Sequence, residues 1–183
     1  MRNQPVHSFG THASFMRNAV LWVTRALGET IRQRATGQRR GIVFAIYRQT
    51  PDAPPRLLGI VPVGSVHPYR VSVFVQFVQE KVRRLTRHQG HVSSFQSRNL
   101  RQNKYAGAIV ANGYYLVVSG LSDDLADEAI AIVAAYKLGL LDLVQAAYLA
   151  SISGNALCET VLASMQQGIK LPHYETECFR EAA

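Results

Sequence analysis

The chain has 183 residues, of which 48% are hydrophobic and 17% are charged. This composition is typical of one globular domain and excludes an intrinsically disordered chain. No run of 18 apolar residues occurs, and the first residues lack a signal-peptide core, so we expect a cytoplasmic protein without a membrane span. Cys158 and Cys178 are predicted to be free buried thiols, with a disulfide between them as the alternative.

The net charge of +8 is distributed unevenly along the chain. Residues 1–105 carry 17 lysines and arginines against three acids, a balance of +14, whereas residues 106–183 have a balance of −6. This charge asymmetry has three possible explanations: a solvated basic face, an anionic partner, or contact between oppositely charged faces of two subunits. Nucleic acid is the less favoured partner, because no nucleic-acid-binding signature accompanies the basic half.

The first half of the chain predicts a helix followed by a hairpin. After a polar arm (1–13), a helix is expected to begin at the N-cap Ser14, with apolar residues at steps of three and four. Two β-branched runs, 41–49 and 56–64, are joined by the turn Thr-Pro-Asp-Ala-Pro-Pro. Gly59 and Pro62 mark the second run as an irregular or edge strand.

Segment 68–90 is predicted to be a second helix, because it begins with proline and ends with glycine. Its apolar face consists of residues at helical spacing, namely Val71, Phe74, Val75, Val78, Val82 and Leu85. The basic residues are expected to lie off that face, namely Lys81, Arg83, Arg84 and Arg87.

A polar loop (91–104) leads to a second predicted hairpin around Asn112-Gly113, the dipeptide most typical of a type I′ turn. Ser122 is the expected cap of the next helix, which ends at Gly139. Acidic residues at its start suit the positive end of the helix dipole and are expected to face solvent, namely Asp123, Asp124, Asp127 and Glu128.

Two more helices are predicted at 140–152 and 156–168, separated by Ser-Gly-Asn. They are so apolar that they must pack under the sheet or against another subunit. The sequence therefore predicts an α+β fold: an antiparallel sheet of two hairpins with helices packed on it, in the profilin-like order α-β-β-α-β-β-α, plus a C-terminal helical extension. The expected domain spans 14–139, the extension 140–170 and a loose tail 171–183.

Two stretches resemble the HbpS/GlcG-like haem-degrading family, whose fold is profilin-like. The stretch VFAIYRQTPDAPPRLLGIVPVGSVHPYRVSVFVQFVQEKV is similar to the first hairpin and following helix of that family. The stretch ANGYYLVVSGLSDDLADEAIA is similar to its second hairpin, with Val118-Ser119-Gly120 followed by Asp127-Glu128-Ala129. The resemblance covers roughly residues 21–136, although the family's Asp-Ala-Gly-Gly turn is absent here. It implies haem or another tetrapyrrole as ligand, whereas roadblock and longin domains of the same architecture dimerise and scaffold.

Histidines are the first candidates for ligand contacts. His88 and His91 have an i, i+3 spacing that suits a metal or a haem iron, and equally suits the end of a helix dipole. His67 precedes the second helix, either near the pocket that the resemblance implies or as an exposed turn residue. His7 and His12 lie in the arm, where no structure is expected to hold a ligand.

The joint at Ser119 and Gly120 is the second candidate, because a strand-to-helix turn can offer backbone donors to a ligand or simply reverse the chain. The acids after it are not expected to act as a catalytic pair, since a solvent-facing turn does not shift their pKa values. No phosphate loop, nucleophile elbow, His-Glu-x-x-His or Cys-x-x-Cys motif occurs, and an enzyme is accordingly the least favoured class.

Two functions are therefore expected. The first is a non-catalytic small-molecule binding or accessory protein, with haem as the implied ligand and contacts from His67, His88, His91, Ser119 and Gly120. The alternative is a roadblock-like scaffold that forms homo-oligomers and meets an acidic partner with its basic face. Its predicted interface residues are Tyr136, Leu140 and Tyr148.

Overall fold

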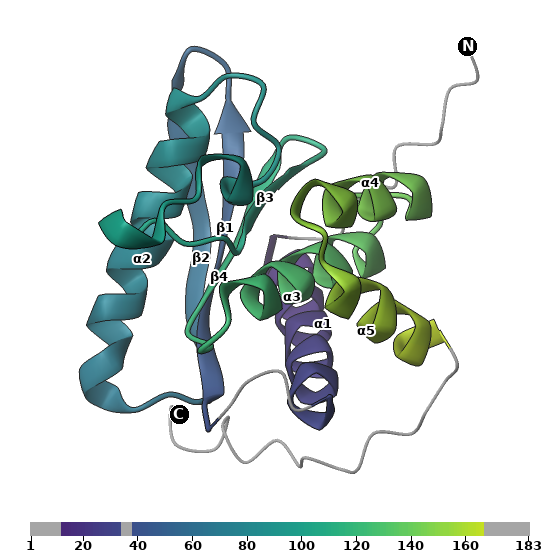
Figure 1. The fold of residues 1–183 in the computed structure, drawn as a ribbon. Helices are drawn as coiled ribbons and strands as arrows, with labels where there is room; N and C mark the ends of the chain where they lie inside the picture. Colours follow the sequence, from purple (N-terminus) through teal and green to yellow (C-terminus); the bar gives the residue numbers. More distant parts are fainter. Residues whose placement is uncertain (1–11, 34–37, 167–183) are drawn as a thin grey trace.

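The computed structural model describes residues 12–33 and 38–166, so the predictions for His7, Cys178 and the tail lie outside the described residues. Figure 1 shows helices on both sides of one antiparallel sheet. The elements are α1 (His12–Arg32), β1 (Arg40–Thr50), β2 (Ala53–Ser65), α2 (Pro68–Arg87), η1 (Ser94–Ser97), η2 (Leu100–Gln102), β3 (Ala108–Ala111), β4 (Tyr114–Ser119), α3 (Asp124–Lys137), α4 (Leu143–Ser153) and α5 (Ala156–Gln166). The predicted α+β fold class is confirmed, with the helices and hairpins in the expected order.

The sheet has the order β2-β1-β4-β3, so the second strand of the first hairpin is an edge strand, as predicted. An edge tolerates the prolines of β2, because one side of the strand needs no backbone donors. The register shifts beside Tyr47, where Ile46 faces Gly59 but Tyr47 faces Leu57. This bulge bends the edge strand locally. The turn before β2 is shorter than expected, because only Pro51 and Asp52 lie between the strands.

Side chains alternate between two cores on the opposite faces of the sheet. The face covered by α2 carries Val43, Ala45, Tyr47, Ala108, Tyr115 and Val117. The other face carries Ile42, Phe44, Ile46, Ile109, Leu116 and Val118, and packs against α1 and α3. Helices α4 and α5 cover the outer side of α3, which explains why α3 is apolar nearly all round (Figure 1).

Glycine and asparagine occupy the turns that need positive φ angles. Asn112 and Gly113 have φ angles of 44° and 77°, as the predicted type I′ turn requires. Gly139 ends α3 with a φ angle of 70°, also as predicted. At Gly120 a Cβ atom would lie 2.7 Å from the Cα atom of Ile42, so only glycine lets the end of β4 approach β1 this closely.

Two predicted helix caps were wrong. Helix α1 begins at His12, so Ser14 lies inside its first turn and part of the expected arm is helical. The N-cap of α3 is Asp123 and not Ser122, because the Asp123 carboxylate accepts a hydrogen bond from the Leu125 N–H at 2.9 Å. The expected loop 91–104 contains the two short helices η1 and η2.

Of the helices in the described ranges, none has the length and hydropathy needed to cross a lipid bilayer.

Candidate ligand-binding cleft

An open cleft of about 950 Å³ lies at the end of the sheet where α2 finishes. One wall is the last turns of α2 and the segment that follows, from Gln79 to Val92. The other wall is the tip of the β1–β2 hairpin, from Tyr47 to Leu57, including the bulged register. We call this space the α2–hairpin cleft. Its volume is near the upper end of the roughly 300–1,000 Å³ usual for small-molecule sites.

The floor of the cleft is aromatic and apolar. Tyr47 and Tyr115 are direct partners across β1 and β4, and both line the cleft together with Val82, Leu85 and other apolar side chains. Burial raises the pKa of both tyrosine hydroxyls. Neither hydroxyl has a hydrogen-bond partner among the described residues, and both oxygens reach solvent although the rings are buried. They are therefore available to a ligand, as polar groups at the edge of an apolar surface.

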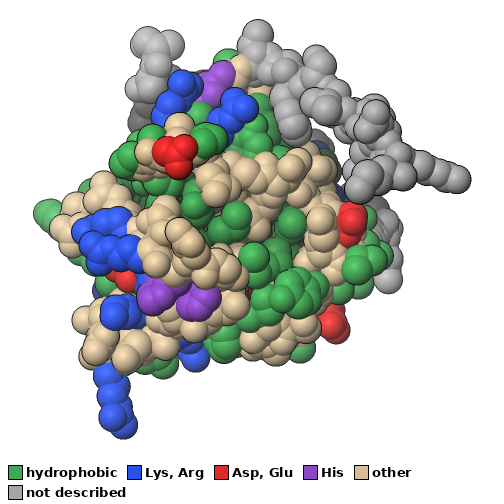
Figure 2. Space-filling model, turned by 90° about the horizontal axis from the view of Figure 1, so that it is seen from above, with side chains coloured by type: hydrophobic (Ala, Val, Ile, Leu, Met, Phe, Trp, Pro, Cys, Tyr) green, Lys and Arg blue, Asp and Glu red, His purple; other side chains and the backbone are tan. Residues whose placement is uncertain are grey.

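Two of the predicted ligand-binding histidines meet at the rim of the α2–hairpin cleft. The rings of His88 and His91 are stacked, with centroids 4.9 Å apart and 18° between the ring planes. Figure 2, seen from above, shows two adjacent histidine side chains on this surface. The Nδ1 atom of His91 is buried and has no hydrogen-bond partner in the described part of the chain. Gly90 lies between them with a φ angle of 91°, which turns the chain so that the second ring folds back onto the first.

The other predicted ligand residues lie elsewhere. His67 is exposed at the opposite end of α2, where its ring stacks on Tyr69 at 5.1 Å. Ser119 is buried at the end of β4, and Gly120 lines a second, smaller hollow together with His67. The five candidates are therefore separated: His88 and His91 line the α2–hairpin cleft, His67 and Gly120 line the second hollow, and Ser119 lines neither.

The predicted interface residues differ in exposure. Tyr148 on α4 is 60% exposed, whereas Tyr136 is half-buried against the core. Leu140 is 3% exposed and belongs to the chain's own hydrophobic core, so a charged residue there would act on folding and not on subunit contact. Leu143 and Val144 were missed by sequence reasoning and lie exposed beside Tyr148 on the same helix.

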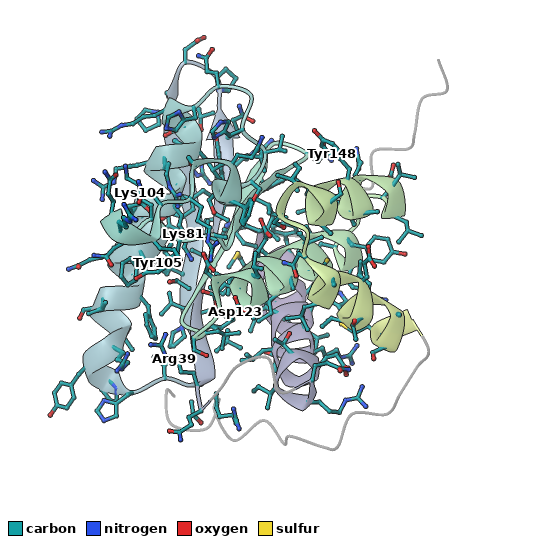
Figure 3. All side chains as sticks on the ribbon, in the orientation of Figure 1. Arg39, Lys81, Lys104, Tyr105, Asp123 and Tyr148 are labelled. Carbon is teal, nitrogen blue, oxygen red and sulfur yellow. The ribbon has the colours of Figure 1, made fainter. Side chains whose placement is uncertain are left out.

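The expectation that Lys81 points away from the apolar face of its helix is wrong. Its side chain is fully buried, donates a hydrogen bond to the Val118 carbonyl at 2.6 Å and lies 3.7 Å from the Asp127 carboxylate. Burial lowers the pKa of Lys81, and the Asp127 charge counteracts part of this. Figure 3 shows Lys81 between α2 and the sheet. The ammonium group thus holds α2 against β4 and α3.

Three of the four acids at the start of α3 are buried, contrary to the expected solvent-facing turn, and Asp123 alone of the four is exposed as expected. Asp127 accepts hydrogen bonds from the Gly120 and Leu121 N–H groups at 3.2 and 3.1 Å. Burial raises the pKa of Asp127 to about 6, although Lys81 and these two donors lower it. The carboxylate therefore fixes the strand-to-helix joint that the sequence marked with Ser119 and Gly120.

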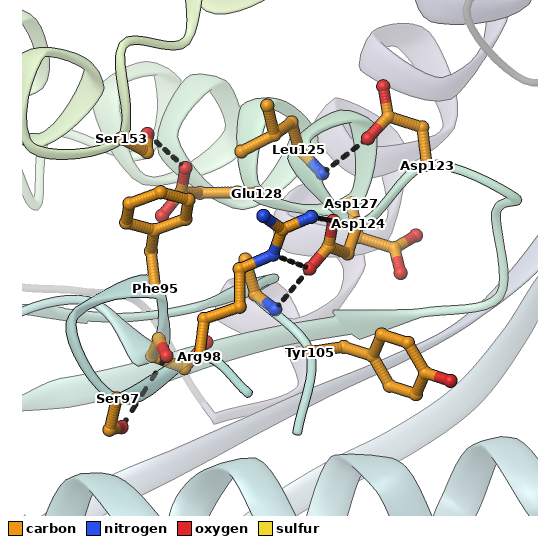
Figure 4. A network of polar contacts seen from close by, with 12 residues as sticks. Phe95, Ser97, Arg98, Tyr105, Asp123, Asp124, Leu125, Asp127, Glu128 and Ser153 are labelled. Atoms are coloured by element: carbon orange, nitrogen blue, oxygen red, sulfur yellow. Dashed lines mark hydrogen bonds and ion pairs between the residues drawn. The ribbon is translucent and has the colours of Figure 1, made fainter. Parts of the chain in front are cut away.

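Asp124 has a different environment one turn away. Arg98 donates two hydrogen bonds to it at 2.8 Å each, and the Ala106 N–H donates a third at 2.8 Å (Figure 4). Burial disfavours the charged carboxylate, but these donors outweigh it and lower the pKa of Asp124. The bidentate pair ties the segment between η1 and β3 to the start of α3.

Glu128 joins three further segments in the interior. Its carboxylate accepts hydrogen bonds from the Ser93 and Ser153 hydroxyls and from the Asn155 side-chain amide. Figure 4 shows the contact with Ser153. Because Ser153 and Asn155 flank the break between α4 and α5, this one acid connects both C-terminal helices to α3.

Arg84, also expected off the apolar face, is buried as well. Its guanidinium donates to the carbonyl oxygens of Ser94, Ser97 and Tyr105, and it pairs with Glu80. These buried charged groups are not among the residues that line the α2–hairpin cleft. Their effect on the cleft is indirect, because they fix the helix that forms one of its walls.

Cys158, as predicted, is a free and buried thiol. Burial raises its pKa to about 12, which leaves it protonated and unreactive at neutral pH.

No protein-family model, curated protein or solved structure matches the chain. The geometry of the described residues therefore carries the functional argument.

Proposed function

We propose that the protein binds a planar aromatic ligand of tetrapyrrole size in the α2–hairpin cleft. The observation that carries this proposal is the combination, in one space of about 950 Å³, of an apolar floor with polar groups that lack partners among the described residues. Small-molecule sites have this character: mostly apolar walls and a few polar groups that set the orientation of the ligand. The proposed activity is binding, storage or delivery, and not a reaction.

The side chains around the cleft fit a haem. Imidazole nitrogen is a common axial ligand of haem iron, and the histidine pair at the rim offers it. Arg83 also lines the cleft and is exposed, so it offers a cation to the carboxylates of a tetrapyrrole. Tyr47 and Tyr115 offer aromatic surface below. The resemblance of both hairpins to a haem-degrading family agrees with this choice of ligand.

The test is a hemin titration of the purified protein, followed at the Soret band. We expect a spectral shift that saturates at a fixed ratio and weakens at least about tenfold in His91→Ala, since an axial bond is lost. The matched control is His67→Ala, which removes an exposed histidine at the other end of α2. A titration curve that does not saturate, or an equal loss of hemin affinity in both variants, would contradict the proposal.

The alternative function, a self-associating interaction module, is favoured by one observation. Helix α4 exposes Leu143, Val144 and Tyr148, and it contains no charged residue. A second copy of the same helix suits such a face, because it brings no charge that would need a partner. Sedimentation of the full chain tests this: a dimer that dissociates in Tyr148→Asp supports self-association, and a monomer at all concentrations excludes it.

A further inference from the structure

A second hollow of about 260 Å³ lies at the opposite end of α2 from the α2–hairpin cleft. It is formed where β1 begins, where β2 runs into α2 and where β4 ends, and Figure 3 shows Arg39 toward this end of α2. The 20 residues of α2 span about 30 Å. The hollow is therefore separate from the α2–hairpin cleft, and what it binds does not depend on the proposed function.

The lining of this hollow is strongly basic. Arg39, Arg40 and Arg70 contribute three guanidinium groups and His67 contributes an imidazole, and among the described residues no aspartate or glutamate lines the space. Such a concentration of positive charge around a hollow raises the local concentration of anions. We call it the arginine hollow.

The groups that hold Arg39 within the described part of the chain are neutral. It donates hydrogen bonds to the carbonyl oxygens of Gly120 and Leu121 at 3.1 and 2.8 Å, and its guanidinium lies 6.0 Å from the centre of the Phe74 ring. Carbonyls and an aromatic face orient the cation without neutralising it. The remaining N–H groups of Arg39 thus keep a positive charge at a fixed position.

The nearest acids along the chain are already committed to other partners. In the turn after Gly120, the Asp123 carboxylate caps α3, Asp124 pairs with Arg98, and Asp127 pairs with Lys81. Asp124 and Asp127 are therefore compensated by cations, whereas Asp123 is exposed and keeps its negative charge. Asp123 is not among the residues that line the hollow.

The start of α2 adds few backbone donors to the same hollow. Pro68 has no N–H group, and the Arg70 N–H already donates to the His67 carbonyl at 2.8 Å. The first turn of the helix contains no acid that would compete with an anion. The arginine side chains are therefore the donors on which the hollow depends.

We propose that the arginine hollow binds the phosphate group of a small phosphorylated compound. Guanidinium groups match the oxygen geometry of phosphate and form paired hydrogen bonds with it. The volume of 260 Å³ is below that of most sites for drug-sized ligands, so it suits a compact group such as phosphate or pyrophosphate. A nucleic-acid strand would need an extended series of cations, which a single small hollow does not offer.

The test is calorimetric titration of the full chain with pyrophosphate at low ionic strength, with a single-stranded oligonucleotide as the competing ligand. We expect saturable binding that weakens about tenfold in Arg70→Gln, because a charge-assisted contact is lost. Arg70 is exposed, so this change is not expected to disturb folding. Arg39→Gln is expected to weaken binding further, with its melting temperature recorded because Arg39 also holds the Gly120 turn.

The matched control is Arg87→Gln, which removes the same charge from the exposed last turn of the same helix. Pyrophosphate affinity within twofold of the unmodified protein in Arg87→Gln, with loss in Arg70→Gln, supports the site. Absence of saturable binding overturns the proposal. Equal losses in both variants, or tighter binding of the oligonucleotide with a steep dependence on salt, also overturns it, because each points to the general positive charge of the surface.

Discussion

Tyr47 on β1 and Tyr115 on β4 are direct cross-strand partners, and both line the α2–hairpin cleft with hydroxyl groups that have no partner among the described residues. Cross-strand aromatic pairs normally stabilise a sheet by contact of their rings. A phenylalanine pair would supply that contact equally well. The two hydroxyls are thus in excess of what the fold needs at this position, which is why we assign them to the ligand.

Replacement of Tyr115 by phenylalanine tests this assignment. Because no hydrogen bond within the described chain is lost, we expect the free energy of unfolding to change by less than about 0.5 kcal/mol. The affinity for hemin should fall about fivefold if the hydroxyl contacts the ligand. Tyr114→Phe is the control. Tyr114 directly precedes Tyr115 in β4, and its ring faces Phe15 on the other side of the sheet. Equal affinities in both variants would contradict the assignment.

The buried pair of Lys81 and Asp127 predicts strong coupling between two substitutions. Asp127→Asn leaves the Lys81 ammonium buried without a counter-charge, and should cost about 3 kcal/mol of unfolding free energy. The double variant Lys81→Met with Asp127→Asn removes both charges, and should recover at least about 1 kcal/mol of that loss. Urea unfolding measures both values. A cost of the double variant equal to the sum of the costs of Lys81→Met and Asp127→Asn, each measured alone, would show that the charges do not interact.

The lowered pKa of Asp124 predicts that its contribution to the free energy of unfolding decreases at acidic pH. Its pKa is lowered in the folded protein, so the stability it contributes is present above its unfolded value near 3.8 and disappears as the pH falls through the lower folded value. Asp124→Asn should therefore cost about 2 kcal/mol at pH 7, and less as the pH falls below 3.8.

The control for that series is Asp123→Asn at the neighbouring position. Asparagine caps a helix about as well as aspartate, so this change should have little effect at any pH between 3 and 7. Thermal unfolding at several pH values gives the comparison. A cost of Asp124→Asn that is constant with pH would mean that the Arg98 pair is not what stabilises this carboxylate.

Glu128 predicts a local effect at the C-terminal helices. Glu128→Gln weakens its contacts with Ser93, Ser153 and Asn155, and should cost about 2 kcal/mol. Hydrogen exchange should become faster in α4 and α5, because the acid connects the break between them to α3. Glu159→Gln is the control, since Glu159 is exposed on α5. Exchange that increases equally in both variants would contradict this role.

The sheet and its turns could be predicted because their signals are local. Asn112-Gly113 and Gly139 need positive φ angles, and few other residues adopt them at low cost. The edge position of β2 follows in the same way from Gly59 and Pro62. Each of these assignments depends on a few neighbouring residues and not on distant contacts.

The burial of Lys81 was missed because the basic residues of its helix were all assigned to the surface. Lys81 is three residues after Val78 and four before Leu85, so it lies on the apolar stripe of α2 by helical spacing alone. That spacing was the signal for its burial. Its partner on α3 follows only from the way the chain brings α2 and α3 to the end of β4, which no local pattern contains.

The separation of the five ligand candidates in space also follows from the fold, and not from a local sequence pattern. His88 and His91 are close in sequence and were expected to act together, and the structure places them in contact. His67 is separated from them by the whole length of α2, because that helix is continuous from Pro68 to Arg87. A hairpin-to-helix turn and a helix end cannot line one site when a straight helix of this length lies between them.

Hydrogen exchange with and without saturating hemin tests the central claim most directly. The account predicts slower exchange confined to the two walls of the α2–hairpin cleft, residues 47–57 and 79–92, with no change around the arginine hollow at 65–70. Protection elsewhere, or hemin binding without protection of either wall, would contradict the account, because the ligand would then not occupy the space that the tyrosine and histidine pairs enclose.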